Sequence, residues 1–288
     1  LIATNWVGTH GNQIWNNSGR ATAVFEPNAG IAAVTLSAGI TVAGLKVIAG
    51  GRYAISGSPL SLAGPGGPID VQGGLQIDAD IQGTVGLTKT GLGALTIFGA
   101  STYTGNTLLQ GGTLRYAGSS LPAGPLNVGT GTRLEVYNAA DVATGGAITG
   151  NGVLEKGGAG ALAVPGLSGF DGDIFVQSGV MRIGPNGLSG NRAVYVAPGA
   201  ALYFDGLTTE LHLAGLNIFG GGRVYSSNAN RVYWQNDAQS SFVATVNAGL
   251  ATLPGVEAGV SYAQNLAAPE NSVLYRFCLL YTSPSPRD

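Results

Sequence analysis

The chain has 288 residues, among them 49 glycines, 13 Lys or Arg and 15 Asp or Glu, and its net charge is −2. This charge argues against the basic surface that nucleic-acid binding requires, and no run of about 18 apolar residues predicts a membrane helix. Glycine exceeds twice its usual share of about 7%, but there is no Gly-X-Y period, and 44% hydrophobic residues are too many for a disordered linker. Abundant Val, Leu, Ile and Thr beside few helix-forming residues predict an all-β protein with many tight turns.

The first thirty residues are the most polar and aromatic part of the chain, and they contain Trp6 and Trp15. Terminal repeats of stacked proteins differ from the others because they must close an open core. We therefore expect both tryptophans to belong to a cap. The alternative is a ligand-stacking platform for sugar rings, to which Tyr233 and Trp234 would also contribute in a lectin-like module.

From Ile31 onward, apolar residues stand at positions i and i+2 in a series of short segments, which predicts strands with one buried face. Gly, Pro and Ser separate these segments and supply the turns. The first seven predicted strands are residues 34–36, 40–42, 45–47, 53–55, 60–62, 69–71 and 75–77.

Residues 83–116 recur, without a gap, as residues 150–183, at an offset of 67. Both copies share glycines, a lysine and the alternating apolar positions. The matched pairs include Lys89 with Lys156, Gly91 with Gly158, Gly93 with Gly160, Leu95 with Leu162, Tyr103 with Phe170 and Leu114 with Met181.

Leu95, Leu114 and Leu134 recur at near-equal intervals, and about three such intervals make up the repeated unit. Each interval corresponds to one coil of about 20 residues. Coils of this length, built from short strands and glycine turns, predict a parallel β-helix, or β-solenoid. Residues 1–277 would form about twelve coils. A β-sandwich, the alternative, would not explain an ungapped repeat of this length.

The alternation also predicts which side chains face the core and which face solvent. Thr96, Arg115, Glu135 and Arg182 should point outward. The predicted inward positions are Leu95, Ile97, Leu114, Leu134, Val136, Leu154, Leu162, Val164, Met181, Ile183, Leu202 and Phe204.

The composition changes after Gly222, which divides the chain into three predicted parts. Residues 1–222 form the β-helix, and residues 223–277 are either its irregular continuation or the start of another module. Residues 278–288 contain the single cysteine and resemble a translated sequencing adapter, so we interpret them as an artefactual tail. Because the sequence begins at Leu1, we expect it to be a segment of a longer protein.

Three elements of residues 83–116 resemble the autotransporter-associated β-strand repeat of bacterial surface proteins. They are Leu87-Thr-Lys89-Thr-Gly91-Leu-Gly93-Ala-Leu95, Thr102-Tyr103-Thr104-Gly105 and Gly111-Gly112-Thr113-Leu114. The second copy is degenerate, with Phe170-Asp-Gly172 and Gly179-Val-Met181 at the last two elements. The two copies cover about a quarter of the chain.

This resemblance implies a right-handed β-helical passenger that is exported across the outer membrane of a Gram-negative-type bacterium to the cell surface or the medium. It implies no catalytic residues and no cofactor, and an outer-membrane translocation barrel outside this sequence as a partner. The expected function is a non-enzymatic stalk or adhesin-like segment, with surface glycans or proteins of a host or neighbouring cell as partners. The alternative is a carbohydrate-active or carbohydrate-binding β-helix.

The only acidic pairs that suggest chemistry are Asp78 with Asp80 and Asp171 with Asp173. Residues at i and i+2 of a strand point to the same face, so each pair could share a Ca²⁺ ion or, with acids and basic residues of neighbouring coils, cleave a polysaccharide. Turn chemistry and solvation explain them more simply, and they remain weak calcium candidates.

Overall fold

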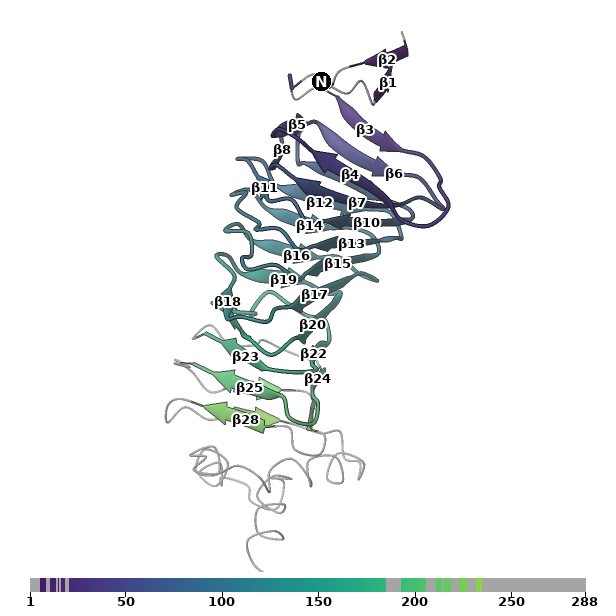
Figure 1. The fold of residues 1–288 in the computed structure, drawn as a ribbon. Helices are drawn as coiled ribbons and strands as arrows, with labels where there is room; N and C mark the ends of the chain where they lie inside the picture. Colours follow the sequence, from purple (N-terminus) through teal and green to yellow (C-terminus); the bar gives the residue numbers. More distant parts are fainter. Residues whose placement is uncertain are drawn as a thin grey trace, which may run out of the picture. The chain divides into compact units, whose positions relative to one another are not determined.

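The computed structural model describes residues 21–184 without a break, together with residues 6–8, 11–13, 15, 17–18, 193–205, 211–213, 215–218, 223–226 and 232–234. Every regular element in these ranges is a strand (Figure 1). Among them there is accordingly no helix long and apolar enough to cross a membrane. The chain divides into two compact units, residues 1–124 and 125–288. The predicted tail at 278–288 lies outside the described residues.

The first unit consists of three ladders of parallel strands, preceded by an antiparallel pair of β1 (Trp6–Gly8) and β2 (Gly11–Gln13). The first ladder contains β3 (Thr22–Phe25), β6 (Gly44–Val47), β9 (Pro68–Val71), β12 (Leu87–Thr90) and β14 (Thr107–Leu109). The second contains β4 (Ala32–Leu36), β7 (Arg52–Gly57), β10 (Gly74–Ile77), β13 (Ala94–Ile97) and β15 (Thr113–Tyr116). The third contains β5 (Ile40–Val42), β8 (Leu60–Leu62) and β11 (Ile81–Gln82), and a parallel bridge to Ser101 extends it.

The second unit is built in the same way. Its first ladder contains β16 (Leu126–Val128) and β19 (Ile148–Gly150), with a parallel bridge to Phe170. The second contains β17 (Arg133–Tyr137), β20 (Val153–Gly157), β22 (Ile174–Val176), β24 (Ala193–Val196) and β27 (Gly215–Ile218). The third contains β18 (Val142–Ala143), β21 (Ala161–Val164), β23 (Val180–Ile183), β25 (Ala201–Phe204) and β28 (Arg223–Ser226), and β26 (Leu211–Leu213) pairs with β29 (Val232–Trp234).

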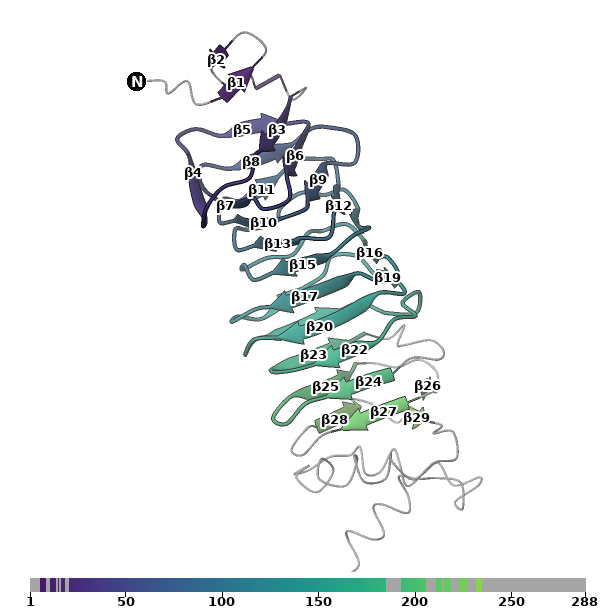
Figure 2. The same ribbon diagram turned by 90° about the vertical axis from the view of Figure 1, so that its right-hand side faces the viewer.

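Each unit is therefore a parallel β-solenoid, as predicted, in which the chain visits the ladders in turn and then starts the next coil. Leu75 pairs with Leu95 and Leu95 with Leu114, which confirms the predicted coil length. In Figure 2, β10, β13 and β15 lie one beneath another. The described coils run from Thr22 to Trp234 and make about nine turns, slightly fewer than the about twelve expected for residues 1–277. The predicted boundary at residue 222 stays a prediction, although β28 and β29 still pair in parallel.

The core of each unit is made by the inward residues of its ladders. All twelve residues predicted to face inward are buried, and none is more than 2% exposed. Among the four predicted to point outward, Glu135 differs because it is only 7% exposed. It is flanked on the same side of β17 by two large side chains, Arg133 and Tyr137, and it lies opposite Glu155 of the next coil.

The two repeat copies have the same local pairing. In the first, β12 pairs with β14 and β13 with β15; in the second, β20 pairs with β22 and β21 with β23. Gly91 and Gly158 occupy equivalent corners with φ of 75° and 76°. A Cβ atom there would lie 2.4 Å or less from a carbonyl oxygen of the preceding coil, so both left-handed conformation and close approach require glycine.

The repeated lysines occupy equivalent buried cages. Lys89 Nζ donates hydrogen bonds to the carbonyl oxygens of Thr90, Gly91 and Gly111, at 2.7, 2.8 and 3.0 Å. Lys156 Nζ donates to those of Gly157, Gly158 and Ser178, at 2.5, 2.9 and 3.2 Å. Each acceptor of the second cage occupies the position in the repeat that its counterpart occupies in the first. The third acceptor belongs to the next coil, so the ammonium group joins two corners.

Both lysine side chains are fully buried. Burial lowers the pKa of each ammonium group from 10.5 to about 8, and a nearby carboxylate, Asp70 or Asp141, partly opposes this. At neutral pH both lysines are therefore mostly charged, and their three N–H donors match the three carbonyl acceptors. The lysine in the repeat serves the stacking of coils.

A second buried network distinguishes the two copies. In the first copy, the Tyr103 hydroxyl hydrogen-bonds to Thr107 Oγ1 at 2.6 Å and to the Tyr116 hydroxyl at 2.5 Å. Burial raises the pKa of Tyr116 to about 12 and that of Tyr103 well above its usual value, so both phenols remain neutral. The equivalent residues in the second copy are Phe170, Ile174 and Ile183, all buried and apolar. The whole polar group has thus been exchanged for an apolar one, which avoids leaving a buried hydroxyl without a partner.

We predict that Lys89→Met lowers the free energy of unfolding by about 3 kcal/mol or more, because it leaves three carbonyl groups without this donor at about 1–3 kcal/mol each. Chemical denaturation followed by circular dichroism measures this loss. Lys46→Met is the matched control, since Lys46 is exposed on β6 of the same unit. Equal effects of the two substitutions would contradict the cage.

For the hydroxyl network, we predict that Tyr103→Phe and Thr107→Val each cost about 1–2 kcal/mol of stability. The triple variant Tyr103→Phe/Thr107→Val/Tyr116→Phe should cost clearly less than the sum of its three single substitutions, because it removes all the partners together. The same denaturation experiment tests this, and strictly additive losses would show that the hydroxyl groups do not act as a network.

Candidate functional site on the outer face of the second unit

Four outward positions of the second unit lie one above another, because each recurs one coil after the last. Glu135 is opposite Glu155, Glu155 opposite Phe175, and Phe175 opposite Tyr195. Neighbouring positions in a parallel ladder bring side chains on the same face into contact. We call these four residues the outer ladder.

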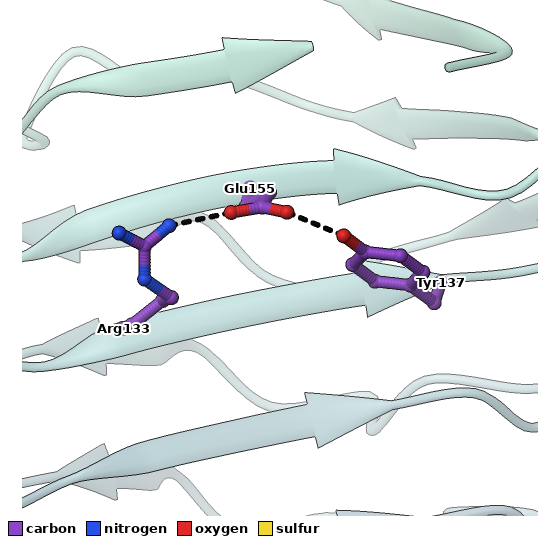
Figure 3. Close-up of polar contacts among 3 residues, drawn as sticks. All are labelled: Arg133, Tyr137 and Glu155. Carbon is purple, nitrogen blue, oxygen red and sulfur yellow. Dashed lines mark hydrogen bonds and ion pairs between the residues drawn. The ribbon is translucent and has the colours of Figure 1, made fainter. Parts of the chain in front are cut away.

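In the acidic part of the outer ladder, two residues of β17 bind the Glu155 carboxylate (Figure 3). Arg133 Nη1 forms an ion pair with Glu155 Oε2 at 2.5 Å, and the Tyr137 hydroxyl donates a hydrogen bond to Glu155 Oε1. The Glu155 side chain is 12% exposed, whereas that of Arg133 is 40% exposed. Two glutamates opposite each other would repel, and this pair of donors compensates for that repulsion.

The aromatic part of the outer ladder is a stack of two rings. The rings of Phe175 and Tyr195 are nearly parallel, with an interplanar angle of 6° and centroids 4.6 Å apart. The guanidinium of Arg133 lies 5.9 Å from the centroid of Phe175, within the range of a cation–π contact. Arg133 therefore connects the acidic and aromatic parts of the ladder.

A similar connection between coils occurs on β23 and β25. Arg182 donates to both carboxylate oxygens of Asp205, at 2.8 and 3.0 Å, and its guanidinium lies 4.6 Å from the Tyr203 ring centroid. Such a two-pronged pair fixes the orientation of both groups. In both places a charged residue ties one coil to the next on the outer surface.

These arrangements are better suited to holding coils together than to catalysis. A general acid or base must exchange a proton with a substrate, but both oxygens of Glu155 already accept from Arg133 and Tyr137. Likewise, Phe175 has Tyr195 stacked against it and Arg133 nearby, which restricts access to its ring. The outer ladder is a surface on which a glutamate–arginine pair lies beside two stacked aromatic rings.

The sequence itself contains a signal for this ladder. Glu135, Glu155, Phe175 and Tyr195 follow one another at a constant interval, which is the length of one coil. A coil of that length makes such positions neighbours, so the predicted coil length would have identified the outer ladder. The side-chain partners of Glu155 could not be found in this way, because they depend on rotamers.

The predicted calcium candidates are exposed and belong to different units. In the first unit, Asp78 accepts two hydrogen bonds from Gln76 Nε2, at 2.9 and 3.1 Å, and Asp80 Oδ1 accepts from the Ala100 amide at 2.8 Å. In the second unit, Asp171 and Asp173 flank a buried glycine. Within the described ranges, no three His, Cys, Asp or Glu residues lie close enough to hold a metal ion. Calcium binding by these four aspartates stays a prediction.

Of the four predicted ligand-stacking residues, the structure describes the side chain of Trp15 alone. It is half-buried, and its indole Nε1 donates to the Thr41 carbonyl oxygen at 3.0 Å. This bond ties the N-terminal segment to β5. Trp6 lies on β1, and Tyr233 and Trp234 lie on β29, but their side chains are outside the described residues.

We predict that Glu155→Gln lowers the free energy of unfolding by about 1–2 kcal/mol, because it replaces a charge-assisted hydrogen bond between coils by a neutral one. Thermal and chemical denaturation measure the loss. Glu26→Gln provides a matched substitution at an exposed position. If both variants unfold like the parent chain, Glu155 does not join the coils.

Comparison with known proteins agrees with the resemblance of the repeat. The family described as "Passenger-associated-transport-repeat" matches residues 87–115, which include the Lys89 cage. The chain is 34% identical to the "Adhesin BmaC autotransporter" of Brucella suis biovar 1 (strain 1330) over 154 residues. The aligned region is 53% of this chain but only 4% of that protein. No solved structure matches.

The matched repeat and the solenoid architecture agree with each other, since residues 87–115 form the two stacked strand pairs β12–β14 and β13–β15. The chain carries a passenger-associated transport repeat at residues 87–115 and is similar over about half of its length to an autotransporter adhesin, and both findings support export across the outer membrane to the cell surface.

Proposed function

We propose that this chain is an adhesive, non-enzymatic segment of a surface passenger. The proposal rests on a difference between the corners of the coils and their outer faces. The charged residue that recurs in the repeat, Lys89 in the first copy and Lys156 in the second, donates its hydrogen bonds inside the corners. The outer faces, in contrast, carry side chains that differ from coil to coil, such as Glu155, Phe175 and Tyr195.

Such a scaffold suits adhesion for a physical reason. Backbone pairing and the corner cages supply contacts between coils that do not involve the outer side chains, so most outer positions can vary. The relative in Brucella suis is named as an adhesin, which supports the same role here. The partners would be glycans or proteins on the surface of a host or neighbouring cell.

The non-enzymatic part of the proposal rests on how the described acidic groups are used. Glu155 is bound by Arg133 and Tyr137, and Asp80 receives the amide of Ala100. Asp141 similarly accepts a hydrogen bond from the Ala161 amide at 2.7 Å. Carboxylates that position the next coil are poorly available for acid–base chemistry.

Surface display tests the adhesive role. The whole chain, fused to a heterologous outer-membrane translocator on a non-adherent bacterium, should increase the number of cells retained on host-cell monolayers. An unrelated β-solenoid displayed at equal density is the control. Equal retention of the two strains would overturn adhesion and leave a spacer or stalk role.

The same purified chain tests the absence of catalysis. Incubation with a panel of polysaccharides should release neither reducing ends nor unsaturated sugar products. Product formation that depends on any of Asp78, Asp80, Asp171 or Asp173 would overturn the non-enzymatic assignment and favour the carbohydrate-active alternative.

A further inference from the structure

The first unit has a groove of about 520 Å³ on the outer side of β7, β10 and β13. Its floor is low because Gly74 pairs with Ala94 of the next coil, two positions with minimal side chains. The volume lies within the range of about 300–1,000 Å³ typical of ligand sites. The groove is thus a feature of the sheet surface, formed where two outward side chains are missing.

Two glutamines at the groove have carboxamides of fixed orientation. Gln72 Nε2 donates to Asp70 Oδ1 at 3.0 Å, and Gln76 Nε2 donates to both oxygens of Asp78. An ionised carboxylate only accepts hydrogen bonds, so each aspartate holds the NH₂ side of its glutamine. The amide oxygen of each glutamine is turned to the other side of the carboxamide, as an acceptor for a ligand hydroxyl.

The remaining lining combines a cation with apolar surface. Arg52 is exposed and contributes guanidinium donors, whereas Ile31 is 68% exposed and contributes an apolar surface. Tyr53 also borders the groove, but it lies opposite the inward Leu75, its ring packs against Phe25 with centroids 4.8 Å apart, and its hydroxyl donates to the Glu26 carbonyl oxygen at 2.7 Å. Amide groups beside the exposed aliphatic side chain of Ile31 match the hydroxyl groups and the C–H face of a sugar.

The charge around the groove selects among saccharides. Asp70 and Asp78 lie next to the two glutamines and would repel an anionic ligand, while Arg52 supplies one opposing positive charge. We propose that this groove binds a neutral oligosaccharide. This deepens the adhesive function proposed above, and its biological meaning rests on that function, but the binding itself is a separate measurement.

The experiment uses the purified whole chain on an array of neutral and anionic glycans, followed by calorimetry with the neutral glycans that bind. Gly74→Val is designed to fill the groove. A Cβ atom at Gly74 would meet only Arg52 Cγ, at 3.7 Å, and the residue lies on a strand without a positive φ. Valine is favoured in strands, so we expect the variant to fold. Ala33→Val, at an exposed position of β4 in the same sheet, is the matched control.

We expect Gly74→Val to weaken neutral-glycan binding by about tenfold or more, and Ala33→Val to leave it unchanged. Gln76→Leu should also weaken binding, which tests the groove by a second route if Gly74→Val alters the circular dichroism spectrum. Binding to anionic glycans alone, binding to no glycan, or full binding by a folded Gly74→Val variant would each overturn the inference. Adherence of displaying cells that survives Gly74→Val would overturn the groove as the adhesive site while leaving the adhesive function intact.

Discussion

Hydrogen bonding between one coil and the next is the constraint on which everything else in this protein depends. A parallel ladder has no hairpin to hold its strands, so each strand must find its partner a whole coil later in the sequence. Leu95 illustrates this regular pairing, because it pairs with Leu75 of the preceding coil and Leu114 of the next. The corners must then be short and must stack closely, which explains glycine at positions such as Gly91, where a Cβ atom would collide with the preceding coil.

The corners also have to satisfy their own carbonyl groups, and the buried lysines do this. A single ammonium group serves two carbonyls of its own corner and one of the next coil, in both repeat copies. Burying a charge is costly unless it is fully hydrogen-bonded, and the cage meets this condition. The tyrosine network of the first copy is replaced entirely in the second, whereas the lysine cage is kept. The cage therefore belongs to the stacking of coils, and the tyrosine network is one of several ways to fill a core.

Stacking also decides what the outer faces can do. Residues one coil apart become neighbours, so Glu155 meets Phe175 and Gly74 meets Ala94 although each pair is distant in the sequence. Where large residues occupy the same outer position in adjacent coils, their side chains bind one another, as around Arg133. Where small residues occupy it, they leave a groove, as above Gly74. Both features arise from the same register, and only the second leaves room for a ligand.

The sequence alone determined the fold class, the coil length and the core, because the alternation along each strand and the longer period from coil to coil are both visible in it. It also identified the repeat that the family comparison matches at residues 87–115. It did not reveal that Lys89 lies in a cage, since an inward lysine is credible only when its three acceptors are known. The positions of the outer ladder follow from the coil length, but the partners of Glu155 and the groove above Gly74 do not, because both depend on how side chains of different coils are oriented. The periodicity can be read from the sequence, whereas contacts between side chains of different coils exist only in the folded solenoid.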